Sequence, residues 1–68
     1  MIYAAGIDVG STQTKGIIID EEQRIIARAL GMTGANVTRA GANCFNEALK
    51  LANVKREDVR YVIGTGYG

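Results

Sequence analysis

The segment that decides the fold of this chain is Ala5-Gly6-Ile7-Asp8-Val9-Gly10-Ser11-Thr12-Gln13-Thr14-Lys15. Its first part is apolar apart from one carboxylate, and it then breaks into a glycine, two hydroxyls and an amide. A second apolar run, from Gly16 to Ile19, follows directly. Because short runs rich in β-branched side chains favour strands, the pattern predicts a strand, a tight turn and a second strand.

The turn between these strands has the composition of a phosphate-binding loop. Gly10 lets backbone N–H groups approach an anion without a Cβ in the way, and Ser11 and Thr12 add hydroxyl donors. Lys15 supplies a cation that acts on a phosphate as a point charge. Gln13 is a further candidate, for orienting a phosphate or a water molecule.

Asp8, at the end of the first strand, is the candidate metal ligand. A hydrated Mg²⁺ ion is usually held by one or two carboxylates together with phosphate oxygens, so a single aspartate suits it. The alternative is an ordinary hairpin, in which the glycine and hydroxyl residues only turn the chain and Asp8 only binds turn amides. On the residues of the turn alone, both interpretations stay open.

The bulk composition limits the class of protein. A chain of 68 residues makes at most one small domain, and its net charge of +1 argues against nucleic acid or a membrane surface as an electrostatic partner. The single cysteine, Cys44, forbids an internal disulfide and is typical of a reducing compartment. The apolar runs are too short for a membrane span, and residues 1–9 lack a basic leader. We therefore expect a cytoplasmic protein.

Three strands are expected at the start of the chain, over residues 2–9, 14–20 and 24–30. The first is nearly continuous in apolar side chains, which predicts burial on both of its faces. Residues 20–23 are all polar and predict a hairpin turn. The alternative is a metal-binding acidic cluster, but these carboxylates lack the alternating spacing of a Ca²⁺ loop. Residues 31–36 contain two glycines among small polar side chains and predict a loop. We expect the three strands to form an antiparallel meander.

The period of the apolar residues becomes helical from Thr38 to Asn53. Thr38 is the expected N-cap, with Asn36 as the alternative. Gly41 predicts either close contact between the helix and the sheet or a later start of the helix. Cys44 lies on the apolar face, so we expect a buried hydrophobe and not a ligand or nucleophile. That face contains Ala40, Gly41, Cys44, Phe45, Ala48, Leu49, Leu51 and Ala52.

A charged connection over residues 54–58 leads into a fourth strand, Val59 to Ile63. Since a helix precedes it, this strand is most easily placed parallel to the first. On the residues alone, Gly64 to Gly68 can form a flexible terminus, and the family resemblance described below implies a loop at the end of the fourth strand. The expected fold is therefore α/β, with the element order β-β-β-α-β.

Two segments carry a family resemblance. Gly-Ile-Asp-Val-Gly-Ser-Thr-Gln-Thr-Lys-Gly at positions 6–16 resembles the first phosphate motif of the actin, sugar-kinase and heat-shock-chaperone ATPase superfamily. Ile63-Gly64-Thr65-Gly66-Tyr67-Gly68 resembles the Thr-Gly-Tyr-Gly segment of the activator ATPases of 2-hydroxyacyl-CoA dehydratases. That family includes the ATP-hydrolysing subunits of benzoyl-CoA reductases. The resemblance covers nearly the whole chain and implies the first part of a ribonuclease-H-like fold.

The resemblance also implies a function. Residues 1–68 would be a single, truncated N-terminal part of an actin-like ATPase domain, followed by a second phosphate motif, an adenosine site and a second lobe. The longer protein would bind ATP or ADP with Mg²⁺ and couple hydrolysis to electron transfer to a dehydratase or reductase partner. Family members hold an iron–sulfur cluster between two subunits through cysteines beyond the matched region, and Cys44 does not correspond to them.

The short chain itself is expected to differ from its parent. With most of the active site missing, we expect no ATP hydrolysis by residues 1–68 alone. The fourth strand would form an exposed sheet edge, which predicts pairing between chains and hence a homo-oligomer.

Two alternatives remain. A sugar kinase of the same superfamily begins with a similar strand, turn and strand, although many such kinases carry a tryptophan-containing sugar-contact segment and this chain has no tryptophan. A non-catalytic regulatory or assembly module could also have this fold. Loss of ATP binding on replacement of Asp8 and Lys15 would separate the module from both enzymes.

Overall fold

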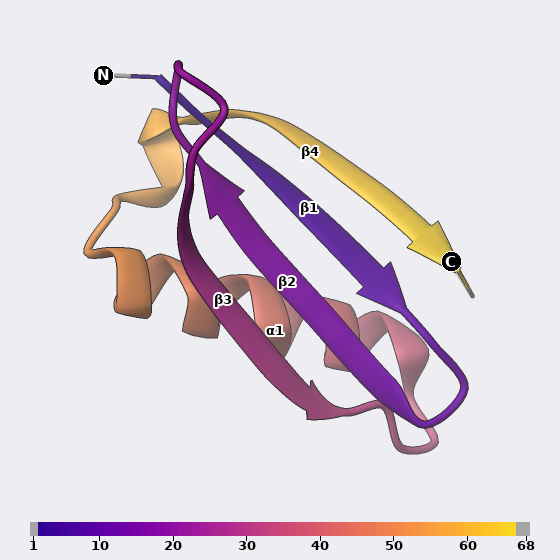
Figure 1. Ribbon diagram of the computed structural model, residues 1–68. Helices are drawn as coiled ribbons and strands as arrows, with labels where there is room; N and C mark the ends of the chain where they lie inside the picture. The colour runs from indigo at the N-terminus through magenta and orange to yellow at the C-terminus, as the bar shows by residue number, and fades with distance from the viewer. Residues whose placement is uncertain (1, 67–68) are drawn as a thin grey trace.

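A computed structural model describes residues 2–66 of the chain as one mixed sheet and one α-helix (Figure 1). The elements in chain order are β1 (Tyr3–Val9), β2 (Gln13–Ile19), β3 (Ile25–Met32), α1 (Val37–Ala52), a short 3-10 helix η1 (Arg56–Asp58) and β4 (Val59–Gly66).

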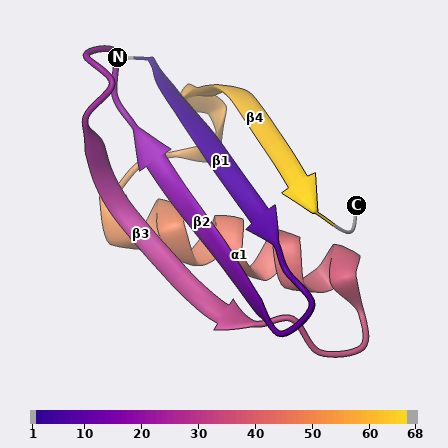
Figure 2. The same ribbon diagram turned by 45° about the vertical axis from the view of Figure 1, so that its right-hand side comes forward.

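The strands lie in the order β3-β2-β1-β4. β1 pairs antiparallel with β2, β2 pairs antiparallel with β3, and β4 pairs parallel with β1. The chain reaches β4 through α1, which crosses one face of the sheet (Figures 1 and 2). Parallel neighbours need such a crossover, so the predicted α/β fold and the parallel fourth strand are confirmed.

The core lies between α1 and the face of β1, β2 and β3 that it covers. Small residues let the two layers approach closely. A Cβ added at Gly16 would lie 3.1 Å from both Cys44 Sγ and Ile7 Cδ1, and one at Gly41 would lie 3.5 Å from Val9 Cγ2. The close helix–sheet contact predicted from Gly41 is therefore confirmed. The buried hydrophobic residues are Ala5, Ile7, Val9, Ile18, Ala29, Ala40, Cys44, Phe45, Ala48 and Leu49.

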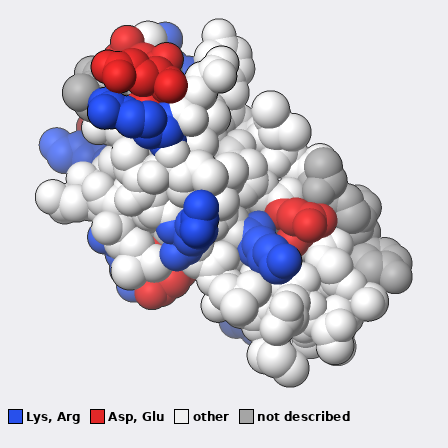
Figure 3. All heavy atoms as spheres, viewed as in Figure 1, with Lys and Arg blue, Asp and Glu red and all other residues white. Residues whose placement is uncertain are grey.

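The opposite face of the sheet is open, so the prediction that the first strand is buried on both faces is wrong within residues 2–66. Along β1, buried Ala5, Ile7 and Val9 alternate with half-buried Gly6 and exposed Asp8. Successive side chains of a strand point to opposite faces, and the one α-helix described covers one of them. Figure 3, in the view of Figure 1, shows that this open face is largely uncharged.

The two glycine-containing segments predicted as loops belong in part to strands, while residues 33–36 form the predicted loop. Gly31 and Met32 pair with Thr14 and Gln13 and belong to β3. Gly64 continues β4 beside Ile7, and the strand runs on to Gly66. Each segment had a neighbouring strand that could accept its backbone hydrogen bonds, which outweighs the local preference of glycine for turns. Residues 67–68 of the predicted loop lie outside the described part of the chain.

The helix begins one residue earlier than predicted, and Asn36 caps it in place of Thr38. Asn36 Oδ1 accepts a hydrogen bond from Arg39 N at 3.0 Å. At the other end, Asn53 adopts a left-handed conformation, with φ of 56°, and closes the helix. Leu51 does not belong to the buried face, because it lies at the margin of that face and is 59% exposed.

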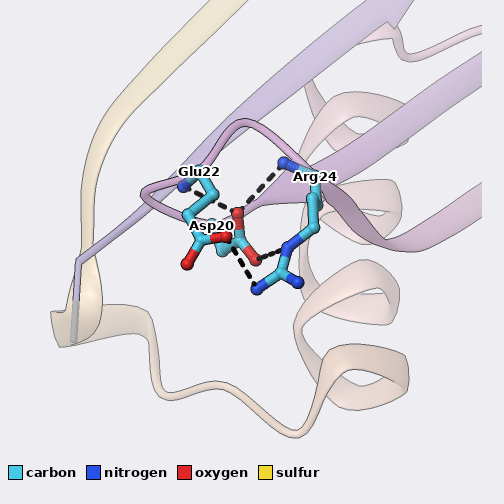
Figure 4. A network of polar contacts seen from close by, with 3 residues as sticks. All are labelled: Asp20, Glu22 and Arg24. Carbon is cyan, nitrogen blue, oxygen red and sulfur yellow. Dashed lines mark hydrogen bonds and ion pairs between the residues drawn. The ribbon is translucent and has the colours of Figure 1, made fainter.

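The β2–β3 turn is the predicted polar hairpin, and it is stabilised by its own residues (Figure 4). Asp20 Oδ1 accepts hydrogen bonds from Glu22 N at 2.9 Å and from Arg24 N at 3.0 Å. Arg24 Nε lies 3.0 Å from Asp20 Oδ2, and Arg24 Nη2 lies 3.4 Å from Glu22 Oε2. The hydrogen bond from Arg24 N is the main cause that lowers the pKa of Asp20 below its ordinary value of 3.8.

No helix within residues 2–66 combines the length and the apolar character that a membrane crossing requires. β4 forms one edge of the sheet, and Tyr61, Val62 and Ile63 are exposed along it. The predicted exposed edge is therefore present, whereas pairing between chains stays a prediction.

Candidate functional site

The β1–β2 turn closes through its first residue. Gly10 N donates a hydrogen bond to Gln13 O at 2.9 Å. A Cβ added at Gly10 would lie only 2.8 Å from that same carbonyl oxygen, so this geometry requires glycine. The Gly10 N–H is thus used inside the turn, and the remaining donors of the turn belong to Ser11 and Thr12.

The tip of the turn faces solvent. Ser11, Thr12 and Gln13 are exposed, and none of the hydrogen bonds within residues 2–66 uses the backbone N–H of Ser11 or Thr12. The side chains of Ser11 and Thr12 add two hydroxyl groups to these N–H groups, and the side chain of Gln13 adds an amide. The tip can therefore offer several donors to an anion.

The carbonyl groups of the same turn face a residue that the sequence did not indicate. Thr33 Oγ1 donates to Gly10 O at 2.7 Å, and Thr33 N donates to Thr12 O at 2.9 Å. Thr33 is 5% exposed and lies between β3 and α1. A threonine beside a glycine in a predicted loop carries no signal of such a contact, because its partners lie 21 and 23 positions away along the chain.

Asp8 and Lys15 come together next to the turn. They are directly opposite each other on β1 and β2, and both are exposed on the open face of the sheet. Side chains opposite each other on antiparallel strands have Cβ atoms about 4.5–5.5 Å apart. Gln13 shares this face, because it lies two positions from Lys15 in β2. The structure thus places the predicted metal ligand, the predicted phosphate cation and Gln13 on one face.

A shallow cavity of about 240 Å³ lies on this face beside the pair. It is open to solvent, and its floor is apolar. Its lining residues are Gly6, Ile7, Asp8, Lys15, Ile17 and Ile63.

The donors present fit a hydrated Mg²⁺ ion held mainly by a nucleotide. Asp8 is an exposed carboxylate two positions before the turn, and Lys15 opposite it can contact a phosphate. A site built from protein ligands alone has no basis in residues 2–66, because no three His, Cys, Asp or Glu side chains group together there.

Cys44 is buried between α1 and the sheet, as predicted. Its Sγ is placed to donate to Ala29 O at 3.5 Å and Thr14 O at 3.6 Å. Burial raises the pKa of the Cys44 thiol, with a smaller contribution from Glu47. A buried, protonated thiol is neither a ready nucleophile nor a cluster ligand.

Comparison with known proteins identifies relatives of this chain. The sequence model of the BadF/BadG/BcrA/BcrD ATPase family matches residues 5–68. The (R)-2-hydroxyglutaryl-CoA dehydratase activating ATPase of Acidaminococcus fermentans is 42% identical over 67 residues, which are 98% of this chain and 25% of that protein. The activator of lactoyl-CoA dehydratase of Anaerotignum propionicum is 31% identical over 98% of this chain and 26% of its own length.

Solved structures agree with these matches. Component A of the A. fermentans (R)-2-hydroxyglutaryl-CoA dehydratase superposes with a TM-score of 0.86 at 41% identity, covering 100% of this chain and 26% of that one. The activator of the 2-hydroxyisocaproyl-CoA dehydratase from Clostridium difficile with bound ADPNP gives 0.83 at 31% identity, covering 98% and 25%. The chain therefore spans about a quarter of the length of the relatives it matches.

Proposed function

This chain belongs to the BadF/BadG/BcrA/BcrD ATPase family, and on that premise we propose that it is the N-terminal portion of an ATP-hydrolysing activator of a 2-hydroxyacyl-CoA dehydratase. The supporting observation is the turn between β1 and β2, which presents exposed donors at its tip with Asp8 and Lys15 beside it. The proposal includes residues 1–68 as one incomplete N-terminal part of an actin-like ATPase domain.

In this proposal the turn binds the phosphates of ATP or ADP. Ser11 and Thr12 donate from their N–H and hydroxyl groups, and Gln13 orients a phosphate or a water molecule. Gly10 contributes by letting the turn close. Lys15 supplies positive charge to the phosphates.

Asp8 would hold the hydrated Mg²⁺ of the nucleotide, an ion that neutralises phosphate charge when bound. The work of these residues in phosphoryl transfer is positioning and charge stabilisation, because the reaction needs little covalent chemistry from the protein. The ADPNP bound to the C. difficile relative supports nucleotide binding at this fold.

The finer functional assignment is also a proposal. We propose that the full-length protein is cytoplasmic, couples hydrolysis to electron transfer to its dehydratase partner, and forms a homo-oligomer with an iron–sulfur cluster. No residue of this chain is assigned to the cluster, since the buried thiol of Cys44 does not fit that role.

The relatives favour this function over its alternatives. The relatives reported above act on the dehydratases of (R)-2-hydroxyglutaryl-CoA, lactoyl-CoA and 2-hydroxyisocaproyl-CoA, which supports a dehydratase partner over a benzoyl-CoA reductase. The family match to ATPases likewise weighs against a sugar kinase. A non-catalytic module would be distinguished by its failure to bind ATP.

The test is ATP binding and hydrolysis by the full-length protein. Lys15→Ala should weaken ATP binding about tenfold or more, since a hydrogen bond to a charged group contributes about 1.5–3 kcal/mol. Asp8→Ala should reduce the Mg²⁺-dependent part of binding and abolish most hydrolysis. Lys50→Ala, an exposed lysine on α1 away from the turn, is the matched control and should change neither.

Wild-type affinity for ATP in both site variants would contradict the proposed site. Residues 1–68 alone should hydrolyse no ATP above an Asp8→Ala background, and turnover above that background would show that the rest of the domain is dispensable.

A further inference from the structure

Thr33 contacts the back of the β1–β2 turn at two points. Its hydroxyl donates to Gly10 O at 2.7 Å, and its backbone N–H donates to Thr12 O at 2.9 Å. A residue from the β3–α1 connection thus holds both carbonyl groups that flank the tip. Thr33 lies outside every motif on which the proposed function rests.

The bond from the Thr33 hydroxyl to Gly10 O fixes the direction of the Ser11 N–H. In a trans peptide the C=O of one residue and the N–H of the next point in opposite directions. None of the described peptide bonds is cis. Because Gly10 C=O points to Thr33, the N–H of Ser11 points away from it, out of the protein.

The hydroxyl of Thr33 has a second partner, the hydroxyl of Thr14. Thr14 Oγ1 lies 2.9 Å from Thr33 Oγ1, and both side chains are buried, at 1% and 5% exposure. A hydroxyl has one proton, and that of Thr33 goes to Gly10 O, so the Thr14 hydroxyl must donate to Thr33. The Thr14 hydroxyl therefore contacts Thr33 and not the turn, and the bond from Thr33 to Gly10 O does not depend on it.

We propose that Thr33 is a positioning residue for phosphate binding, which holds the Gly10–Ser11 peptide so that the Ser11 N–H faces the nucleotide. This rests on the proposed function. Thr33 contacts the turn from the side opposite the phosphates and does not touch the nucleotide. The energetic benefit is that the donors are oriented before the anion arrives, so binding does not have to order them.

The test compares ATP with adenosine as ligands of the full-length protein. Thr33→Val keeps the shape of the side chain and removes the hydroxyl, and it should weaken ATP binding about tenfold, the equivalent of one hydrogen bond. Adenosine has no phosphate, so its affinity should stay within about twofold of wild type, well under the 1.4 kcal/mol of a tenfold change. Thr33→Ser restores the hydroxyl and should restore ATP affinity.

Thr14→Val is the matched control. It removes the other hydroxyl of the buried pair and leaves the bond from Thr33 to Gly10 in place. Its ATP affinity should therefore stay close to wild type. If Thr33→Val does not fold, Thr33→Ser and Thr33→Ala differ from each other by the same hydroxyl, and only Thr33→Ala should lose ATP affinity.

Equal losses for ATP and adenosine, or equal ATP affinities for the hydroxyl-free and hydroxyl-bearing variants, would overturn the role of Thr33. Either result leaves the proposed function intact if the wild type binds ATP. Absence of ATP binding by the wild type would instead refute the proposed function itself.

Discussion

The two hairpin turns of this sheet share β2 and are built in opposite ways. The β2–β3 turn is stabilised from within, because the Asp20 carboxylate accepts the N–H groups of Glu22 and Arg24 and pairs with the Arg24 guanidinium. In the β1–β2 turn, the carbonyl groups of Gly10 and Thr12 accept hydrogen bonds from Thr33, a residue of the β3–α1 connection. N–H groups that the turn's own carboxylate already binds, here those of Glu22 and Arg24, are not available to a ligand anion.

The contrast explains why one turn is the candidate site. Acidic side chains at residues 20–22 satisfy local donors and repel phosphate. The tip at residues 11–12 carries hydroxyls and no carboxylate, and the N–H of Ser11 points away from Thr33, out of the protein. The β1–β2 turn uses the Gly10 N–H and the carbonyl groups of Gly10 and Thr12 for its own bonds, which leaves the N–H groups of Ser11 and Thr12 available.

Among these substitutions, Gly10→Ala in the β1–β2 turn is expected to have the largest effect on the free energy of unfolding. The added Cβ would lie 2.8 Å from Gln13 O, a backbone atom that can move only if the turn opens. The free energy of unfolding should fall by about 2 kcal/mol, within the range for overpacked sites. Chemical denaturation of the protein measures it.

Gly31→Ala is the control for this substitution, because a Cβ at Gly31 meets nothing within 4 Å. Its free energy of unfolding should change by less than about 0.5 kcal/mol. A Gly10→Ala variant as stable as Gly31→Ala would mean that the turn does not need glycine.

A smaller effect is expected from Asp20→Asn in the self-stabilised turn. The folded state lowers the pKa of Asp20 below 3.8, so its contribution is present above that value and is lost as the pH falls through the lowered pKa. The variant should melt at a lower temperature than wild type at neutral pH, and the two should converge in acid below pH 3.8. Melting curves across this pH range measure the difference in melting temperature between wild type and Asp20→Asn. A difference that does not change with pH would show that the stabilisation does not depend on the charge of Asp20.

The smallest effect on stability is expected from Ser11→Ala. Ser11 is exposed at the tip, so the free energy of unfolding should change by less than about 0.5 kcal/mol. ATP affinity of the full-length protein should nevertheless fall severalfold, because a hydroxyl donor to phosphate is lost. A titration that shows unchanged ATP affinity would place the Ser11 hydroxyl outside the phosphate site.

The errors of sequence interpretation have a common cause. The glycines at positions 31 and 64 predict loops because glycine favours turns, yet each lies beside a strand that pairs with it. Leu51 matches the helical period but lies at the margin of the buried face. No local pattern indicates the contacts of Thr33, because they involve carbonyl groups more than twenty positions away. For the two glycines and for Thr33, the deciding partner is distant in sequence.

The amino-acid sequence by itself determined the order of strands and helix, the polar tip at residues 11–13 and the family motifs, because these follow from local periodicity and residue chemistry. Only the tertiary structure decided that Asp8 stands opposite Lys15, that one face of the sheet is open, and that Thr33 turns the carbonyl groups of the tip inward. Strand register and contacts between separate connections depend on how the whole chain packs, so no local pattern specifies them.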